Sequence, residues 1–429
     1  MTADERTWGG WLLLGATLAV GLNLRGPIVA VAPVLDDLQR DLRITETAAG
    51  LLTAAPVLCF AVVSPLVAVL ARRIGIDRTV ALSLVVLAVA IAVRPWSGFT
   101  LMMAGTLLLG IGIAAGNVLL PVVVRRDFSA RTEPVMSAAT TSLLVSASIP
   151  AVFTVPLALL MGWRAALAVW AVLSVASLAL WWLATGRGRR REAATVTTVA
   201  PVAPVAPAGG AGRPGAGRDG AAGDEQPGGG PAERPAAVTS SAWRSFAAWE
   251  LGLFFGLQSL LFYATTAWLP TMLRAHGDLN PAAAGSALSL FQIFGIAGAI
   301  AAPLLIRRRF TRYPTVVALA VMWLVFLVGV LVVPAAWPVL STIGGVAQGA
   351  GIAVAFSLIA VRSSSSDAAR SVSAVVQTIG YFLGAAGPVV VGGIVGVTVG
   401  WTAPFSVLIA VSLTLAVVGV RSAAPRPIR

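Results

Sequence analysis

Long apolar stretches fill most of this chain, and short polar segments separate them. The hydrocarbon core of a bilayer takes about 20 apolar residues in helical form, so each stretch predicts a membrane-spanning helix. Six fall in the first half, near residues 10–35, 47–70, 78–95, 99–123, 134–160 and 164–184. Six more lie near residues 244–271, 282–306, 314–334, 337–361, 370–396 and 401–420. We therefore predict an all-α membrane protein with 12 transmembrane helices in two six-helix bundles.

A segment of different composition separates the two sets of spans. Residues 185–243 are rich in Ala, Gly and Pro, with runs such as Pro201-Val202-Ala203-Pro204 and Gly228-Gly229-Gly230. Such a segment cannot bury a hydrophobic core, and its composition is typical of a disordered tether. The chain is thus predicted to consist of a bundle over residues 1–184, a cytoplasmic linker over 185–243 and a second bundle over 244–429.

The two halves repeat each other weakly. Ala48-Ala49-Gly50 recurs 235 residues later as Ala283-Ala284-Gly285, and Gly162-Trp163 recurs as Gly400-Trp401. Six is an even number of spans, so both halves enter the membrane in the same orientation, as parallel repeats do. A duplicated helical unit in an apolar chain of this size is typical of a secondary transporter.

Composition excludes several other classes of protein. The 429 residues are 58% hydrophobic and 11% charged, whereas soluble domains carry about 25% charged residues. All 30 basic residues are Arg, so a Walker A lysine and Schiff-base chemistry are both absent. One Cys and one His rule out disulfides and the usual Cys/His metal sites. We expect no enzyme activity, catalytic residue, metal or cofactor, and no repeated pore loop indicates a channel.

The arginines are distributed unevenly between the two sides of the membrane. They concentrate in the even-numbered loops and near both termini, and the opposite loops hold only Arg40, Arg43, Arg94, Arg164 and Arg274. By the positive-inside rule, both termini are predicted to be cytoplasmic. The net charge of +13 therefore reflects insertion into the cytoplasmic (inner) membrane, with the lipid bilayer as partner and no nucleic acid. We expect a monomer.

Several motifs lie within the predicted spans. They are Gly21-Leu22-Asn23-Leu24-Arg25, Ala48-Ala49-Gly50-Leu51-Leu52-Thr53, Gly116-Asn117-Val118-Leu119-Leu120-Pro121 and Gly256-Leu257-Gln258-Ser259-Leu260-Leu261-Phe262-Tyr263. With a basic loop after the second span and its copy after the eighth, the chain resembles the major facilitator superfamily. Within that superfamily it resembles the cyanate/nitroimidazole transporters. The resemblance implies two bundles that rock about a central site, and a substrate such as cyanate or a small nitrogen heterocycle.

One loop departs from the superfamily's pattern. The loop after the second span usually carries an acidic residue where this chain has Arg72, and Asp77 is displaced from that place. This departure argues against the charge pairing between bundles that is usual in the superfamily.

Arg25 is the strongest candidate for binding a ligand. An Arg at a helix centre costs about 2.5–3.5 kcal/mol on the insertion scale, so it usually faces a cavity or a partner. It lies roughly 22 Å along the first span, too deep to reach the interface. Its guanidinium is suited to a small anion or an electron-rich polar group. The alternative is a structural tie to helix-end carbonyls or an internal acid, but Glu250 is the one carboxylate well inside a span.

Neutral polar side chains supply the remaining candidates. Asn23 and Gln258 are 235 residues apart, at equivalent places in the first and seventh spans. One alternative is that they hold one ligand from both bundles, and the other is that they form interhelical hydrogen bonds. Either arrangement would satisfy the hydrogen-bonding groups of an amide within the membrane. The same alternatives apply to the other candidates, Asn117, Tyr263, Gln377 and Tyr381.

These observations predict a secondary active transporter for a small anion or a small polar nitrogen compound, working by alternating access. An anion entering a negative cell climbs about 2.3 kcal/mol per 100 mV, so concentrative uptake would need a co-transported proton or an exchanged anion. The alternative is a drug/proton antiporter that exports small amphipathic compounds. The scarcity of acids within the spans disfavours a proton relay of that kind.

Overall fold

The computed structural model describes residues 3–197, 243–306, 312–362 and 366–424, and these residues form helices joined by short turns. The first half contains α1 (Ala3–Gly21), α2 (Gly26–Val29), α3 (Leu35–Leu42), α4 (Glu46–Ile74), α5 (Ile76–Val93), α6 (Phe99–Asp127), α7 (Thr132–Ala168) and α8 (Ala171–Thr197). The second half contains α10 (Phe246–Gly277), α11 (Pro281–Ile306), α12 (Arg312–Val332), α13 (Trp337–Arg362), α14 (Ser366–Val397) and α15 (Thr402–Ser422).

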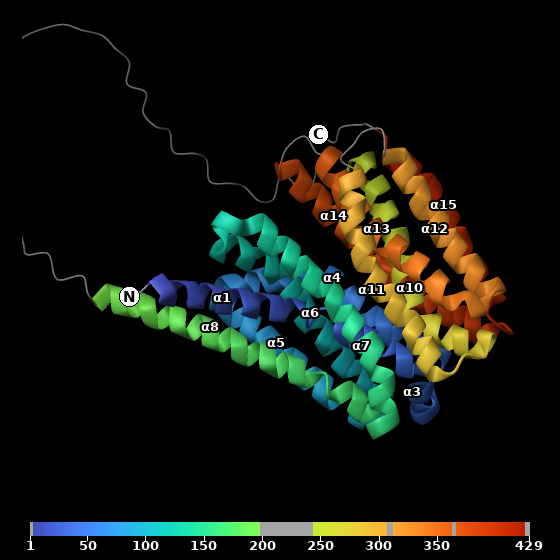
Figure 1. Cartoon of the computed structure of the whole chain (residues 1–429), viewed down its shortest axis with the longest axis horizontal. Helices are drawn as coiled ribbons and strands as arrows, with labels where there is room; N and C mark the ends of the chain where they lie inside the picture. The colour runs from blue at the N-terminus through green and yellow to red at the C-terminus, as the bar shows by residue number, and fades with distance from the viewer. Residues whose placement is uncertain (1–2, 198–242, 307–311, 363–365, 425–429) are drawn as a thin grey trace, which may run out of the picture.

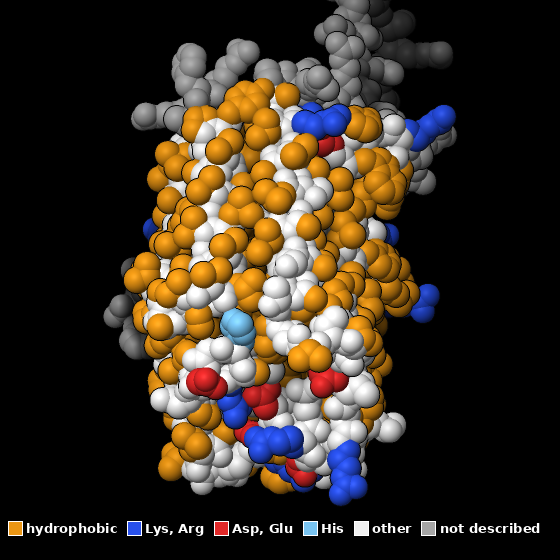
Figure 2. All heavy atoms as spheres, turned by 90° about the vertical axis from the view of Figure 1, so that its right-hand side faces the viewer, with side chains coloured by type: hydrophobic (Ala, Val, Ile, Leu, Met, Phe, Trp, Pro, Cys, Tyr) orange, Lys and Arg blue, Asp and Glu red, His pale blue; other side chains and the backbone are white. Residues whose placement is uncertain are grey.

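The described residues confirm the all-α membrane fold. Eleven helical segments are long and apolar enough to cross a bilayer, and Ala171–Gly186 is a shorter apolar helix in the place of the sixth span. Hydrophobic side chains cover the middle of the face shown in Figure 2, and charged side chains gather mostly toward its two ends. This distribution suits a chain whose middle lies in hydrocarbon.

Glycines with positive φ mark equivalent turns in the two repeats. Gly162 has a φ of 79° and interrupts α7 between the predicted fifth and sixth spans, and Gly400 has a φ of 84° between α14 and α15. A side chain at either position would strain this backbone, so the repeated Gly-Trp motif corresponds to a repeated turn. Arg43 and Asp278, the non-glycine residues with positive φ among those described, are 235 residues apart and end α3 and α10.

Two predicted boundaries differ in the structure. The first span is not one helix over 10–35, because α1 ends at Gly21 and residues 22–25 form a turn before α2. The predicted linker is not disordered from residue 185 on, because α8 continues to Thr197, although the apolar part of this helix ends at Gly186, close to the predicted end of the span. Arg, Ala and Glu are good helix formers, so that polar extension stays helical beyond the apolar part. Most of the predicted linker, residues 198–242, lies outside the described residues.

The two bundles contact each other mainly at the end away from the chain termini. In Figure 1 they converge near α3 and diverge toward the ends marked N and C. Across this contact α4 packs on α14, and α7 packs on α11. A Cβ at Gly50 would overlap the Pro388 carbonyl, and one at Gly285 would lie 2.9 Å from Val155. The Ala-Ala-Gly motif of each repeat therefore lies where the bundles touch.

Candidate functional site

A cavity of about 590 Å³ lies between the two bundles. Both halves contribute to its lining, from the turn before α2 and helices α4, α6 and α7 on one side and from α10, α11, α13 and α14 on the other. The lining reaches Thr140 and Ala360, which lie near the ends of α7 and α13 on the side of the termini. Since the bundles close on the opposite side, the cavity opens toward the side of the termini.

The turn in the first span places Arg25 at this cavity. Where α1 ends, backbone groups lose their helical partners, and a buried unpaired group costs about 1–3 kcal/mol. Ser146 of α7 replaces those partners, because its Oγ accepts from the Gly26 N–H at 2.8 Å and donates to the Leu22 carbonyl at 2.6 Å. The Arg25 N–H also approaches this Oγ at 3.3 Å. The break is thus held by a neighbouring helix.

Arg94 supports the same turn from a second side. Its side chain is 1% exposed, and its Nη2 donates to the Pro27 carbonyl at 2.9 Å. Pro27 lies two residues beyond Arg25, so the two contacts by Ser146 and Arg94 flank the residue that faces the cavity. From the sequence, Arg94 was expected in a loop at the end of a span, directly before Pro95, and that position does not reveal this role.

The Arg25 guanidinium lies over the ring of Phe262, with Cζ 5.3 Å from the ring centroid. Arg25 is the one charged residue among the described residues that line the cavity. The ion pairs found among the described residues do not involve it. A cation in a largely apolar cavity without a facing carboxylate favours an anionic or hydrogen-bond-accepting ligand.

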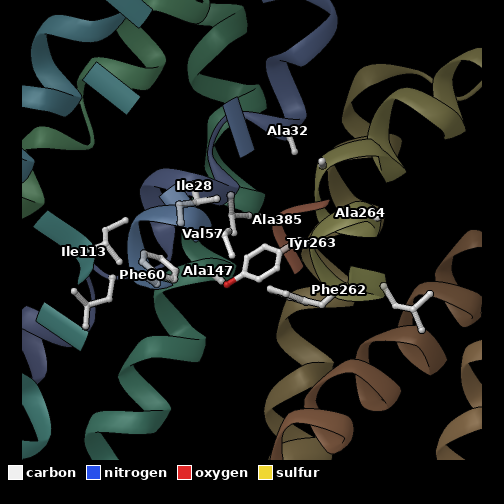
Figure 3. Close-up of a cluster of buried hydrophobic side chains, with 14 of the residues drawn as sticks. Ile28, Ala32, Val57, Phe60, Ile113, Ala147, Phe262, Tyr263, Ala264 and Ala385 are labelled. Carbon is white, nitrogen blue, oxygen red and sulfur yellow. The ribbon is translucent and has the colours of Figure 1, made fainter. Parts of the chain in front are cut away.

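Aromatic rings surround the space beside Arg25. Phe262 and Tyr263 lie edge to face at 4.8 Å between centroids, and Phe60 of α4 meets Tyr381 of α14 in the same way at 5.5 Å. Figure 3 shows Tyr263 reaching from the C-terminal bundle toward Phe60 and Ala147 of the N-terminal bundle. Rings contributed by both bundles form flat walls against which a planar ligand can stack.

Four of the seven predicted site residues line this cavity: Arg25, Asn117, Tyr263 and Tyr381. Further polar lining, which was not predicted, comes from Thr140, Thr266 and Ser357. These hydroxyl residues lie in apolar stretches and carry no distinguishing spacing, so no signal in one sequence separates them from other buried Ser and Thr.

Asn23 lies outside the cavity lining and is 1% exposed. Its Nδ2 donates to Ser177 Oγ at 2.8 Å, and its Oδ1 accepts from Ser174 Oγ at 2.7 Å. Both partners are on α8, so the amide joins the turn after α1 to another helix of the same bundle.

Gln258 and Gln377 also lie away from the cavity lining. The buried Gln258 donates from Nε2 to the Gln348 carbonyl at 3.1 Å, and its Oε1 accepts from Trp323 Nε1 at 3.0 Å. Gln377 donates to Ser373 on its own helix at 2.9 Å. For Asn23 and Gln258 the alternative of hydrogen bonds between elements of one bundle is thus the better account, and all three amides lie outside the cavity lining.

Two charged residues from the sequence analysis pair within a single bundle. Asp77 of α5 accepts from Arg126 of α6 at 2.6 Å, which is a contact inside the N-terminal bundle and agrees with its displacement from the usual loop position. Glu250 is buried between Arg362 and Arg421 of the C-terminal bundle, 3.5 Å from a nitrogen of each. Neither Asp77 nor Glu250 lines the central cavity.

Two helical bundles that enclose a central cavity, in a multi-pass apolar chain, define a membrane transporter. Residues 13–388 match the family model described as Major Facilitator Superfamily, and the chain belongs to this family. Solved structures share the fold at low identity. The crystal structure of a D-xylose-proton symporter has a TM-score of 0.67 and 12% identity and covers 96% of each chain. That of the nucleoside transporter NupG has a TM-score of 0.68 and 14% identity, and covers 96% of this chain and 99% of that one.

Three bacterial transporters are similar along most of their length. The chain is 33% identical to the uncharacterized transporter YycB of Bacillus subtilis (strain 168), over 95% of this chain and 92% of that protein. It is 30% identical to the 2-nitroimidazole transporter of Escherichia coli (strain K12), over 97% of both. It is 26% identical to the cyanate transport protein CynX of the same organism, over 88% of both. The predicted resemblance to this group is confirmed.

Proposed function

We propose that this transporter moves a small anion or a small polar nitrogen compound across the cytoplasmic membrane by alternating access. One observation carries the proposal: Arg25 enters the central cavity without a carboxylate among the described lining residues. The guanidinium presents a planar fork of donors that matches carboxylate, nitro or similar paired oxygens. Asn117, Tyr263 and Tyr381 would supply further hydrogen bonds from both bundles.

The size and shape of the cavity favour a ring-sized ligand over a three-atom ion. Sites for organic ligands usually have volumes of about 300–1,000 Å³, and this cavity falls within that range at about 590 Å³. A planar heterocycle can stack on the Phe262 and Tyr263 rings while its acceptor group meets Arg25. A cyanate-like ion would leave most of the aromatic surface uncontacted. We therefore favour a nitroimidazole-like compound among the two substrate classes transported by the similar proteins.

The uneven arginine distribution supports a cytoplasmic position for both termini, and the cavity would then face the cytoplasm in this structure. A neutral heterocycle would cross without opposing the membrane potential. An anion would leave the cell downhill, and its concentrative uptake would require a co-transported proton or an exchanged anion.

The test compares 2-nitroimidazole with cyanate on the full-length protein. Thermal stability in detergent is measured against each compound, because a ligand that binds only the folded state raises stability with its concentration. Radiolabelled flux into proteoliposomes is measured in parallel. We expect 2-nitroimidazole to stabilise the protein and to be transported, with cyanate competing only at much higher concentration. Tighter binding of cyanate would contradict the ring-sized ligand. Drug/proton antiport would be favoured if a proton gradient drove the flux of bulky neutral drugs, and if neither 2-nitroimidazole nor cyanate bound or was transported.

A further inference from the structure

A second hollow lies on the outside of the C-terminal bundle, at the end that carries the chain termini. Its volume is about 600 Å³, similar to that of the central cavity. It is bounded by the first turns of α10, the middle of α14 and the last turns of α15. We call it the outer groove and define it by Phe246, Leu253, Phe382 and Val417, with Trp243 and Trp249 at its end.

The apolar side chains of the outer groove are exposed where a membrane protein meets lipid. Phe246 is 68% exposed and Val417 is 62% exposed, which is unfavourable in water and ordinary against acyl chains. Leu253 lies seven residues after Phe246, about 10 Å along α10 at 1.5 Å per residue. The groove thus runs from the helix ends into the hydrocarbon region. Trp243 and Trp249 lie at the end of the groove near the helix ends, and Trp side chains are enriched at the membrane–water interface.

Positive charge lies at the interfacial end of the outer groove. Arg421 lines the groove, and its side chain is 62% exposed. Arg244 follows Trp243 in the sequence and is also exposed, but it is not one of the residues that line the groove. The one carboxylate in the lining belongs to Glu250, whose side chain is 7% exposed and is shared between Arg421 and Arg362. The exposed Arg421 guanidinium and a carboxylate that is buried and already paired leave this end positive.

We propose that the outer groove binds an anionic phospholipid of the leaflet on the side of the termini. Arg421 approaches Glu250 through Nε, which leaves its two terminal nitrogens to face a phosphate. Arginine binds phosphate oxygens in this forked manner. One acyl chain lies along Leu253, Phe382 and Val417. A free phosphate would contact only the charged end of the groove. The cationic head group of a zwitterionic lipid would be repelled by Arg421. The inference is independent of the transported substrate.

The test titrates the full-length protein with dioleoylphosphatidylglycerol and counts bound lipid by native mass spectrometry. Dioleoylphosphatidylcholine and inorganic phosphate serve as the other probes. Each arginine near an anionic membrane surface changes the affinity by about fivefold. We expect Arg421→Ala to weaken binding of the tightest phosphatidylglycerol by about fivefold. Leu253→Trp, which fills the groove without changing charge, should weaken it as well.

Arg73→Ala is the matched control, because Arg73 is an exposed arginine at the same end of the other bundle. It should leave the tightest lipid in place. Thermal stability shows whether each variant is folded, and Arg421 is exposed enough that its loss should be tolerated. Equal effects of Arg421→Ala and Arg73→Ala would overturn the proposal. So would equally tight phosphatidylcholine, displacement of the lipid by inorganic phosphate, or full binding by Leu253→Trp.

Discussion

Arg25 combines a high cost of insertion with an incomplete set of contacts. An arginine at the centre of a span costs about 2.5–3.5 kcal/mol, and a cation over an aromatic ring recovers about 0.5–2 kcal/mol. Among the described residues, the side-chain contact that the structure gives to this guanidinium is the Phe262 ring. The remaining cost is offset only when the side chain is hydrated or meets a ligand. This balance is why we place the substrate at Arg25.

The first prediction concerns the side chain of Arg25. Arg25→Ala should lower substrate affinity by about ten- to a hundredfold, because a hydrogen bond to a charged group is worth about 1.5–3 kcal/mol. Arg25→Lys should remain impaired, since an ammonium lacks the planar fork. Binding by thermal shift and flux in proteoliposomes measure both effects. Arg40→Ala is the control, because Arg40 has a side chain that is 71% exposed and pairs with Asp37 away from the cavity. Normal affinity in a folded Arg25→Ala variant would exclude the ligand role.

At the scale of helices, the sequence predicted what depends on local composition. Apolar stretches of sufficient length located the spans. The turn at Gly162 falls between two of these spans, and its positive φ is a local requirement that glycine meets. The break after Gly21 was missed, although Pro27 lies close to it. That break is stabilised by Ser146, which lies some 120 residues away in sequence. A hydropathy pattern contains no information about such a partner.

The candidate site shows the same limit. Burial depth identified Arg25, and aromatic or polar character identified Asn117, Tyr263 and Tyr381. Asn23 and Gln258 have equivalent places in the repeats, but their partners differ, with Ser174 and Ser177 on α8 in one case and Trp323 on α12 in the other. Sequence symmetry therefore did not imply a shared ligand.

The second prediction concerns the contact between α4 and α14. Gly50→Ala should prevent the bundles from closing at the end away from the termini, because the added Cβ would overlap the Pro388 carbonyl. Overpacking of this kind costs about 1–3 kcal/mol. Transport should slow, and Thr266→Cys in a Cys59→Ser background should become more reactive to a membrane-impermeant thiol reagent added from that side.

Gly393→Ala is the control for this prediction. Gly393 lies in the same contact, but its added Cβ would approach Thr47 only at 3.8 Å, an ordinary distance. Equal reactivity of Thr266→Cys in the Gly50→Ala and Gly393→Ala backgrounds would show that close approach at Gly50 does not govern closure.

At the scale of the whole molecule, the proposed alternating access would require the bundles to separate where they now touch. The bundles touch at the end of the molecule that carries α3 and diverge toward the termini. Under the proposed mechanism, the contacts at the closed end would belong to one state of the cycle. Asp36 at the start of α3 accepts from Arg274 at 2.8 Å and from Thr271 at 2.7 Å, both on α10. Asp36 and Thr271 are 235 residues apart, so this contact lies where equivalent parts of the two repeats meet.

The last prediction concerns this ion pair between the bundles. The Asp36 and Arg274 side chains are 22% and 25% exposed, so the pair is neither fully exposed nor fully buried. Exposed ion pairs contribute about 0.2–1 kcal/mol, and breaking a buried pair costs about 3–5 kcal/mol. Asp36→Asn should therefore favour the state open at this end by about 1–2 kcal/mol, or roughly five- to thirtyfold. Spin labels are attached at Arg43→Cys and Ala275→Cys in a Cys59→Ser background. Double electron–electron resonance then measures the distance between the two labels. A longer-distance population should grow in Asp36→Asn. It should not grow in Asp37→Asn, because Asp37 pairs with Arg40 on its own helix. If Asp36→Asn and Asp37→Asn give the same distance distribution, closure at this end rests on helix packing and not on the charge pair.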